Sequence, residues 1–143
     1  MRNVACPKTV DPWYLAEVEA VLTATAQLTC MPRLKVSLAE PAGTAHFVLR
    51  FKKESGFALI HGAIETSLPL ICQRCMQAMV QDIDTHFSLR PVHTNAEALR
   101  LPKHCEPLVT HGRAVNIVND IIEEELLLCL PLVPLHPPVQ CRL

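Results

Sequence analysis

The sequence predicts an α+β domain, in which an antiparallel sheet or a partly closed β-barrel carries an N-terminal helix and a C-terminal amphipathic helix packed on it. The middle of the chain alternates apolar and polar residues with a period of two, which is typical of strands. The segments on either side contain helix-forming residues or a helical repeat of apolar residues. The chain has 143 residues, about the length of one domain, so we expect a single domain spanning residues 1–143.

The first expected element is a helix from Pro12 to Cys30, with Asp11 as its N-cap. Threonines at positions 23, 25 and 29 lower helix propensity, so the second half of this segment could be extended instead. Period-two alternation then predicts a series of strands. Their expected ranges are Leu34–Leu38, His46–Phe51, Phe57–Ile71 and Met79–Val92, with turns at residues 40–43 and 52–56.

The region after the last expected strand begins irregularly. The stretch from His93 to Gly112 contains two prolines and few periodic apolar residues, which indicates a long surface loop with one helical turn at Ala96–Leu99. Apolar residues then recur at spacings of three and four, so we expect an amphipathic helix from Ala114 to Leu130. Four prolines between positions 131 and 143 favour an extended tail.

The composition excludes several functional classes. The formal net charge is −1, so the chain has no global positive field that would attract nucleic acid. Any contact with nucleic acid therefore depends on local clusters of cations. No secretory signal and no window of about 20 apolar residues is visible, so we expect a cytoplasmic protein with no membrane partner. Seven cysteines, an odd number, indicate reduced thiols rather than a disulfide framework in such a chain.

Cys72 and Cys75 form a C-x2-C pair between two expected antiparallel strands, where a tight turn can point two thiolates at one tetrahedral cation. His136 and Cys141 in the proline-rich tail are the most economical completion, which would give one structural zinc and would fix the tail to the sheet. Cys105 competes for the fourth position. The alternative is that the paired cysteines are small buried residues at a hairpin. Redox chemistry is disfavoured because strands, not a helix, flank the pair.

Local clusters of cations are the candidates for RNA contact. The expected strands and turns carry arginines and lysines that could gather on one face of the sheet and contact phosphates. These residues are Arg33, Lys35, Arg50, Lys52, Lys53, Arg74 and Arg90. The chain has only four Phe, one Trp and one Tyr, which leaves little aromatic surface for stacking bases. The alternative is a strand edge that lysines protect against aggregation.

The run Glu123-Glu124-Glu125 cannot converge on one metal ion, because consecutive helical residues point about 100° apart. A solvated helix face is its expected role, and the run could equally present an acidic surface to a basic protein partner. The sequence contains no Ser-His-Asp order, phosphate-binding glycine loop or paired-histidine metalloprotease motif. We therefore expect neither an enzyme nor a small-molecule substrate.

Three stretches of the chain carry a resemblance to a known family. They are residues 70–75 followed by residues 87–92, the acidic-to-apolar segment Asp120–Leu130, and Pro131–His136 with Cys141 shortly behind it. Together with an opening Val10-Asp11-Pro12, their order and spacing resemble the YceD family of bacterial proteins over nearly the whole chain. The resemblance implies a role in the synthesis, processing or stability of 23S ribosomal RNA, with no established enzymatic reaction.

We therefore expect a non-enzymatic factor that supports 23S rRNA accumulation and large-subunit assembly by binding pre-23S rRNA or an early large-subunit ribosomal protein. Two alternatives stay open. One is a zinc-stapled adaptor that touches only protein, which an absence of salt-dependent affinity for large-subunit RNA would favour. The other is an RNA-processing enzyme, whose cleavage or modification activity would have to disappear on mutation of a defined site.

Overall fold

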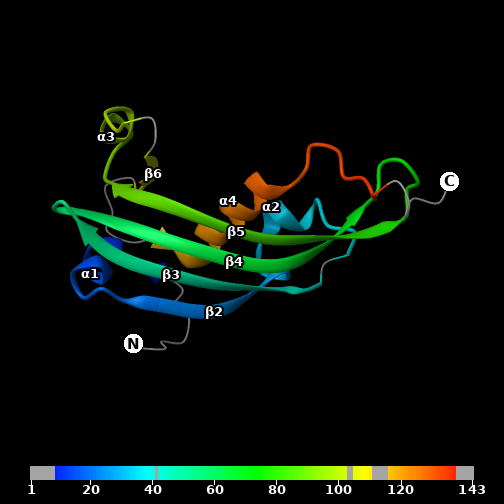
Figure 1. Ribbon diagram of the computed structural model, residues 1–143, viewed down its shortest axis with the longest axis horizontal. Coiled ribbons are helices and arrows are strands. Elements are labelled where there is room, and N and C mark those ends of the chain that lie inside the picture. The colour runs from blue at the N-terminus through cyan, green and yellow to red at the C-terminus, as the bar shows by residue number, and fades with distance from the viewer. Residues whose placement is uncertain (1–8, 41, 103–104, 111–115, 138–143) are drawn as a thin grey trace.

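A computed structural model describes residues 9–40, 42–102, 105–110 and 116–137 (Figure 1). Its centre is a five-stranded sheet in the order β2-β3-β4-β5-β6, in which neighbouring strands are antiparallel except for the parallel pair β5 and β6. The strands are β2 (Val21–Gln27), β3 (Thr44–Glu54), β4 (Phe57–Ile71), β5 (Ala78–Val92) and β6 (Glu106–Val109). A separate antiparallel pair joins β1 (Thr9–Val10) to β7 (Asn116–Ile117).

Helices α1 (Pro12–Glu17), α2 (Pro32–Lys35) and α4 (Val118–Cys129) lie on one face of this sheet, and α3 (Asn95–Leu99) lies beyond its end (Figure 1). The remaining helical segment is the 3-10 turn η1 (Leu28–Cys30). Figure 1 shows α2 and α4 behind the sheet and α3 beyond the end of β5, while α1 contacts β3 and β4. The opposite face of the sheet, which we call the outer face, carries no helix in the described part of the chain.

Alternation along the long strands builds the core. Phe47 and Phe51 of β3 are each 1% exposed, and their register partners on β4 are the fully buried Ile64 and Ile60. Helix α4 adds Ile122 to the same cluster. Removing this apolar surface from water stabilises the fold by about 25 cal/mol for each Å² buried. The helix-covered face is therefore the inner face of the sheet.

Gly62 of β4 permits a close approach of Phe87 of β5. The two residues are register partners, and a Cβ atom at position 62 would lie 2.1 Å from the Phe87 ring. The aromatic ring therefore fills the space that a side chain on β4 would otherwise occupy. Any larger residue at this position would force the ring to move.

A single helix over the expected N-terminal range is wrong, and the extended alternative for its second half is confirmed as β2. Helix α1 ends at Glu17, after Asp11 has capped its start by accepting hydrogen bonds from the amides of Trp13 and Tyr14 at 3.1 and 3.3 Å. Glu19 then has a φ of 49°, which a helix interior does not allow. The β-branched residues that follow favour a strand, and β2 pairs with β3.

The expected strand Leu34–Leu38 is also wrong, because residues Pro32–Lys35 form α2. A proline occupies the first turn of α2, where no hydrogen-bond donor is needed. The carboxylate of Glu123 on α4 accepts hydrogen bonds from the amides of Arg33 and Leu34 at 2.8 and 3.2 Å. This side chain caps α2 from a distant part of the sequence. The local alternation of residues 34–38 cannot indicate such a cap.

The region after β5 is more regular than expected. The helical turn is confirmed as α3, with Thr94 as its N-cap. The expected loop also contains β6, which extends the sheet by pairing in parallel with the last residues of β5. The segment that contains α3 connects the two parallel strands. Helix α4 is confirmed from Val118 onward; the expected start at Ala114 lies outside the described residues, and Asn116–Ile117 form β7.

The α+β class is confirmed, with an N-terminal and a C-terminal helix packed on a mostly antiparallel sheet. The barrel alternative is not adopted, because β2 and β6 stand at opposite edges of an open sheet. Within the described ranges, no helix has both the length and the apolar character needed to cross a membrane.

Candidate metal centre

A tight turn between β4 and β5 presents Cys72 and Cys75. The two strands pair up to the turn itself, as expected for a C-x2-C pair between antiparallel strands. Within the turn, the amide of Cys72 donates to the carbonyl of Gln77 at 2.9 Å, and the amide of Met76 donates to the carbonyl of Cys72 at 2.8 Å. Met76 has a φ of 59°, so the chain reverses in a left-handed conformation next to the second cysteine.

The C-terminal tail returns to this turn. The amide of Gln73 donates a hydrogen bond to the carbonyl of Pro134 at 2.8 Å. His136 then lies against both cysteines: its amide donates to the Cys72 Sγ at 3.4 Å, and its Nδ1 lies 3.3 Å from the Cys75 Sγ. The two sulfurs and a ring nitrogen lie within 4.8 Å of one another, so three of the expected ligands form one cluster.

The imidazole of His136 is oriented by the backbone. Its Nε2 lies 3.1 Å from the carbonyl oxygen of Ala78, at the start of β5. A carbonyl oxygen accepts hydrogen bonds and donates none, so Nε2 carries the proton and the lone pair of Nδ1 points at the sulfur atoms. Histidines that bind metals commonly donate their other ring N–H to a carbonyl in this way.

The local hydrogen bonds favour the thiolate form of Cys72. Burial raises the pKa of this thiol, but the amides of Cys75, His136 and Arg74 donate hydrogen bonds to the sulfur, and Cys75 adds a side-chain hydrogen bond. The net effect lowers the pKa of Cys72 to about 5. Cys72 is therefore ionised at neutral pH, in the form that binds zinc and other soft cations.

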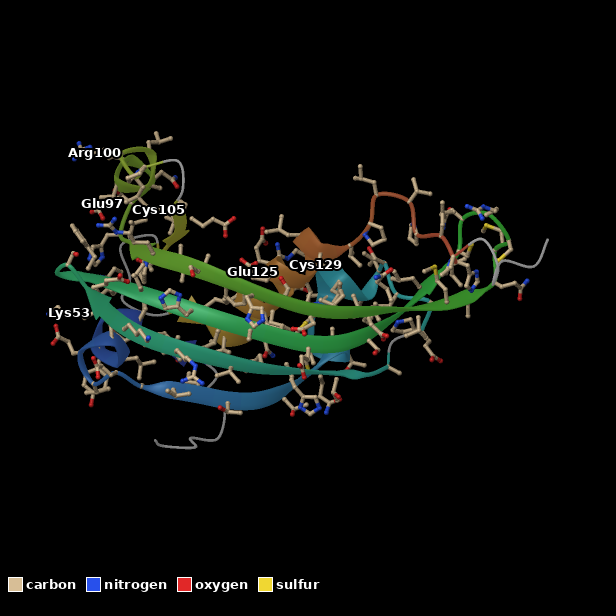
Figure 2. The ribbon with its side chains drawn as sticks, viewed as in Figure 1. Lys53, Glu97, Arg100, Cys105, Glu125 and Cys129 are labelled. Atoms are coloured by element: carbon tan, nitrogen blue, oxygen red, sulfur yellow. The ribbon has the colours of Figure 1, made fainter. Side chains whose placement is uncertain are left out.

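The geometry of the cluster fits a zinc ion. Zinc binds thiolate sulfur at about 2.3 Å and imidazole nitrogen at about 2.0–2.1 Å, so the ligand atoms of a tetrahedral site lie about 3.5–3.8 Å from one another. A small adjustment of the three side chains would satisfy these distances. The fourth expected ligand, Cys141, lies outside the described residues. Its competitor Cys105 precedes β6, which pairs with the far end of β5 from the turn (Figure 2).

Three of the seven candidate RNA-binding residues lie together on the outer face. Arg50 and Lys52 alternate with buried residues of β3, and Arg50 pairs with His61 of β4 across the sheet. The guanidinium of Arg90, on β5, lies 3.6 Å from the centre of the Phe57 ring. Such a cation-π contact holds the guanidinium flat against the ring. We call Arg50, Lys52 and Arg90 the basic cluster.

The other four candidates lie away from the outer face. They are Arg33, Lys35, Lys53 and Arg74. Arg33 donates to two glutamates of α4, at 3.1 and 2.8 Å, and Lys53 forms an ion pair with Glu17 of α1. Lys35 ends α2, and Arg74 is exposed in the turn that carries the cysteines. The expected gathering on one sheet face therefore holds only for the basic cluster.

The expectation of a solvated face for the run of three glutamates is wrong. Glu123 and Glu125 are 2% and 8% exposed, and only Glu124 of the three is exposed. Helix α4 packs against α2 on one side and β5 on the other. Residues 123 and 125 flank the apolar side of the helix, so the neighbouring elements cover both carboxylates.

Comparison with known proteins shows to which family the chain belongs. The model of a family described as large ribosomal RNA subunit accumulation protein YceD matches residues 60–143, which is more than half of the chain. The chain belongs to the YceD family. A curated relative of that name from Haemophilus influenzae is 28% identical over 143 residues, which cover 99% of this chain and 82% of the relative. No solved structure matches the chain.

The YceD match confirms the resemblance that the sequence motifs indicate. The matched range contains Cys72, Cys75 and His136, together with most of β4, all of β5 and α4. It contains Arg90 of the basic cluster, whereas Arg50 and Lys52 precede it. The family name links its members to accumulation of the large-subunit ribosomal RNA and names no reaction.

Two contributors to these sites escaped sequence reasoning. Ala78 acts through its backbone carbonyl, which every residue type possesses, so no residue-type signal for it exists. Phe57 supports Arg90 across two neighbouring strands. A signal for Phe57 was available, because the Ser55-Gly56 turn and the alternation of β4 place its side chain on the outer face.

Proposed function

We propose that this YceD-family chain is a non-enzymatic, cytoplasmic factor that supports 23S rRNA accumulation and large-subunit assembly by binding pre-23S rRNA. The observation that carries the proposal is the basic cluster on the open outer face. Among the described residues, no carboxylate forms an ion pair with Arg50, Lys52 or Arg90. Their charges are available to phosphates, which fix the position of an RNA without reading its bases.

The size of the basic cluster sets the expected salt dependence. Each phosphate that a cation neutralises releases counterions, so log K falls with log salt at a slope of about −0.7 per contact on a single strand. Three cations therefore predict a slope of about −2. Weak and salt-sensitive binding of this kind agrees with a chain whose net charge is −1.

The RNA proposal is tested by reversing two charges of the basic cluster. We expect the Arg50→Glu/Lys52→Glu double variant to lose measurable affinity for pre-23S rRNA fragments, because it repels the phosphates that the wild-type residues attract. The affinity is measured by fluorescence anisotropy across a salt series. Lys35→Glu is the matched control, since Lys35 is exposed on α2, away from the outer face.

The other possible results of this experiment each contradict the proposal in a different way. Unchanged binding by the double variant would show that RNA does not use the outer face. An absence of salt-dependent binding by the wild-type protein would favour the adaptor that touches only protein. Cleavage or modification of the RNA during the assay, abolished by mutation of a defined site, would favour an RNA-processing enzyme.

We further propose that Cys72, Cys75 and His136 hold one structural zinc, with Cys141 as the fourth ligand. Three observations support the site: two sulfurs and one ring nitrogen converge, Cys72 favours its thiolate, and the Ala78 carbonyl orients the imidazole. A bound zinc would join the tail to the β4–β5 turn and would contribute folding free energy.

Elemental analysis of gently purified protein tests the zinc site. We expect about one zinc per chain in the wild type, and a loss of both zinc and thermal stability in Cys72→Ser, because a site with fewer than four ligands binds zinc weakly. Cys30→Ser is the control, since Cys30 is exposed on η1 and outside the cluster. A wild-type protein without zinc, or a Cys72→Ser variant with full zinc content, would refute the site.

A further inference from the structure

A groove on the inner side of the molecule lies between α4 and the β5–β6 edge of the sheet. Its apolar lining includes Leu89, Leu108 and Ile121, and its volume is about 640 Å³. Volumes in this range hold a small molecule or a few side chains. The groove is separate from the metal centre, which lies at the opposite end of β5.

Carboxylates dominate the polar lining of this groove. Glu106 comes from β6, whereas Asp120, Glu124 and Glu125 come from α4. Arg33 is the one cation among the described lining residues, and its guanidinium already contacts Glu124 at 2.8 Å. The groove therefore combines an apolar lining with a surplus of negative charge.

Glu125 distinguishes this groove from an ordinary acidic surface. It is 8% exposed, and among the described residues its carboxylate has no hydrogen bond or ion pair. Burial raises the pKa of Glu125, and the nearby charges of Glu106 and Glu124 raise it further. The charged form of a buried carboxylate in such surroundings is destabilising unless a cation lies beside it, so a positively charged partner would stabilise this group. Figure 2 shows Glu125 on α4, close to β5.

We propose that the groove binds a basic polypeptide segment, with an arginine or lysine of the partner inserted beside Glu125. The long aliphatic stems of these side chains would pack on Leu108 and Ile121 while the head group reaches the carboxylates. RNA does not fit the same chemistry, because its phosphates would be repelled by the four lining carboxylates. The choice of an early large-subunit protein as this partner rests on the proposed role in large-subunit assembly, whereas the chemistry of the groove is independent of that role.

A labelled synthetic peptide of alternating arginine and leucine serves as the probe for the full-length chain. We expect salt-dependent binding by fluorescence anisotropy, and an affinity at least about tenfold lower for Glu125→Gln and for Glu106→Gln. Glu65→Gln is the matched control, because Glu65 is an exposed carboxylate on the outer face. Glu106 is exposed, so its substitution leaves the fold intact, and circular dichroism verifies this for each variant.

Several outcomes would overturn the proposal. They are equal affinity of the probe for wild type and both groove variants, equal affinity for a peptide with serine in place of arginine, and displacement of the probe by large-subunit RNA in the Arg50→Glu/Lys52→Glu background. The last background removes the proposed RNA site. Loss of RNA binding and loss of peptide binding are therefore separate results, and either proposal can fail alone.

Discussion

At the scale of single residues, two buried glutamates of α4 differ in their hydrogen-bond partners. Glu123 accepts hydrogen bonds from the amides of Arg33 and Leu34 and from the Arg33 side chain, so its charge is satisfied. Glu125 is almost as buried but has no such partner among the described residues. Charge-assisted hydrogen bonds stabilise a fold, whereas an unpartnered carboxylate destabilises it. Glu123 therefore stabilises the fold, and Glu125 is the carboxylate that the proposed basic segment would contact.

We expect Glu125→Gln to increase the free energy of unfolding at neutral pH by roughly 1 kcal/mol, because it removes a buried charge. The raised pKa sets the pH dependence. The folded state binds the Glu125 proton more tightly than the unfolded state, so the wild type loses stability as the pH rises from about 4.5 through the raised pKa. The difference between variant and wild type should grow over this window and then level off. Urea denaturation at a series of pH values measures it.

The groups that face Glu125 must be the same in both proteins for this comparison. They are Glu106 from β6, Glu124 and Asp120 from α4, and Arg33 from α2. Glu123→Gln is the opposing control, since it removes satisfied charge-assisted hydrogen bonds and should lower the free energy of unfolding by about 2 kcal/mol. If Glu125→Gln were as destabilising as Glu123→Gln, Glu125 would have a partner within the fold.

At the scale of elements, the sequence predicts those whose periodicity is local and long. The strands Phe57–Ile71 and Met79–Val92 match β4 and β5 within one residue, and the apolar repeat of α4 is present from Val118 onward. Each of these elements buries apolar residues along one face. Their alternation or helical repeat therefore extends over many residues, and this long pattern predicts the element even where single residues favour another structure.

Elements that depend on distant partners were not predictable. Helix α2 alternates like a strand, and the carboxylate that caps it comes from Glu123 on α4. Strand β6 is short, contains Pro107 and pairs in parallel, so it lacks the local signals of a hairpin. Strand β2 was predicted only as an alternative, because its threonines favour an extended chain but no Gly or Pro marks the boundary with α1. In each case tertiary contacts decide the structure.

The two sites differ in the same way. The spacing of Cys72 and Cys75 is a local signal, and prolines keep the tail of His136 extended, so their meeting could be anticipated. The basic cluster requires the strand register, which puts Arg90 on the same face of the sheet as Arg50 and Lys52 and which no local pattern fixes. Of the other four candidate cations, two lie on α2, one forms an ion pair with α1 and one lies in the β4–β5 turn. The groove was not predicted, because in the sequence Glu125 resembles part of a solvated run of charges. Only the packing of α4 against the sheet shows that it is buried.

At the scale of the whole molecule, the candidate sites lie at separate positions on the sheet. Figure 1 shows the β4–β5 turn and the returning tail at one end, and the β3–β4 turn, near the basic cluster, at the other. The acidic groove lies on the inner side, against α4. A negative groove and a positive cluster on opposite faces would keep an RNA and a basic protein apart while one chain holds both.

This separation predicts that metal removal loosens one end of the molecule and leaves the other unchanged. After treatment with a strong chelator, we expect faster hydrogen exchange at the amides of Gln73 and His136, which donate to the tail carbonyl of Pro134 and to the Cys72 sulfur. These contacts open when the ligand cluster comes apart, because local stability depends on local contacts. The amides that pair Arg50 with His61 are the internal control and should keep their protection. Unchanged exchange at Gln73 and His136 would show that no metal joins the tail to the turn. A uniform increase over the whole sheet would instead show that the metal governs global folding.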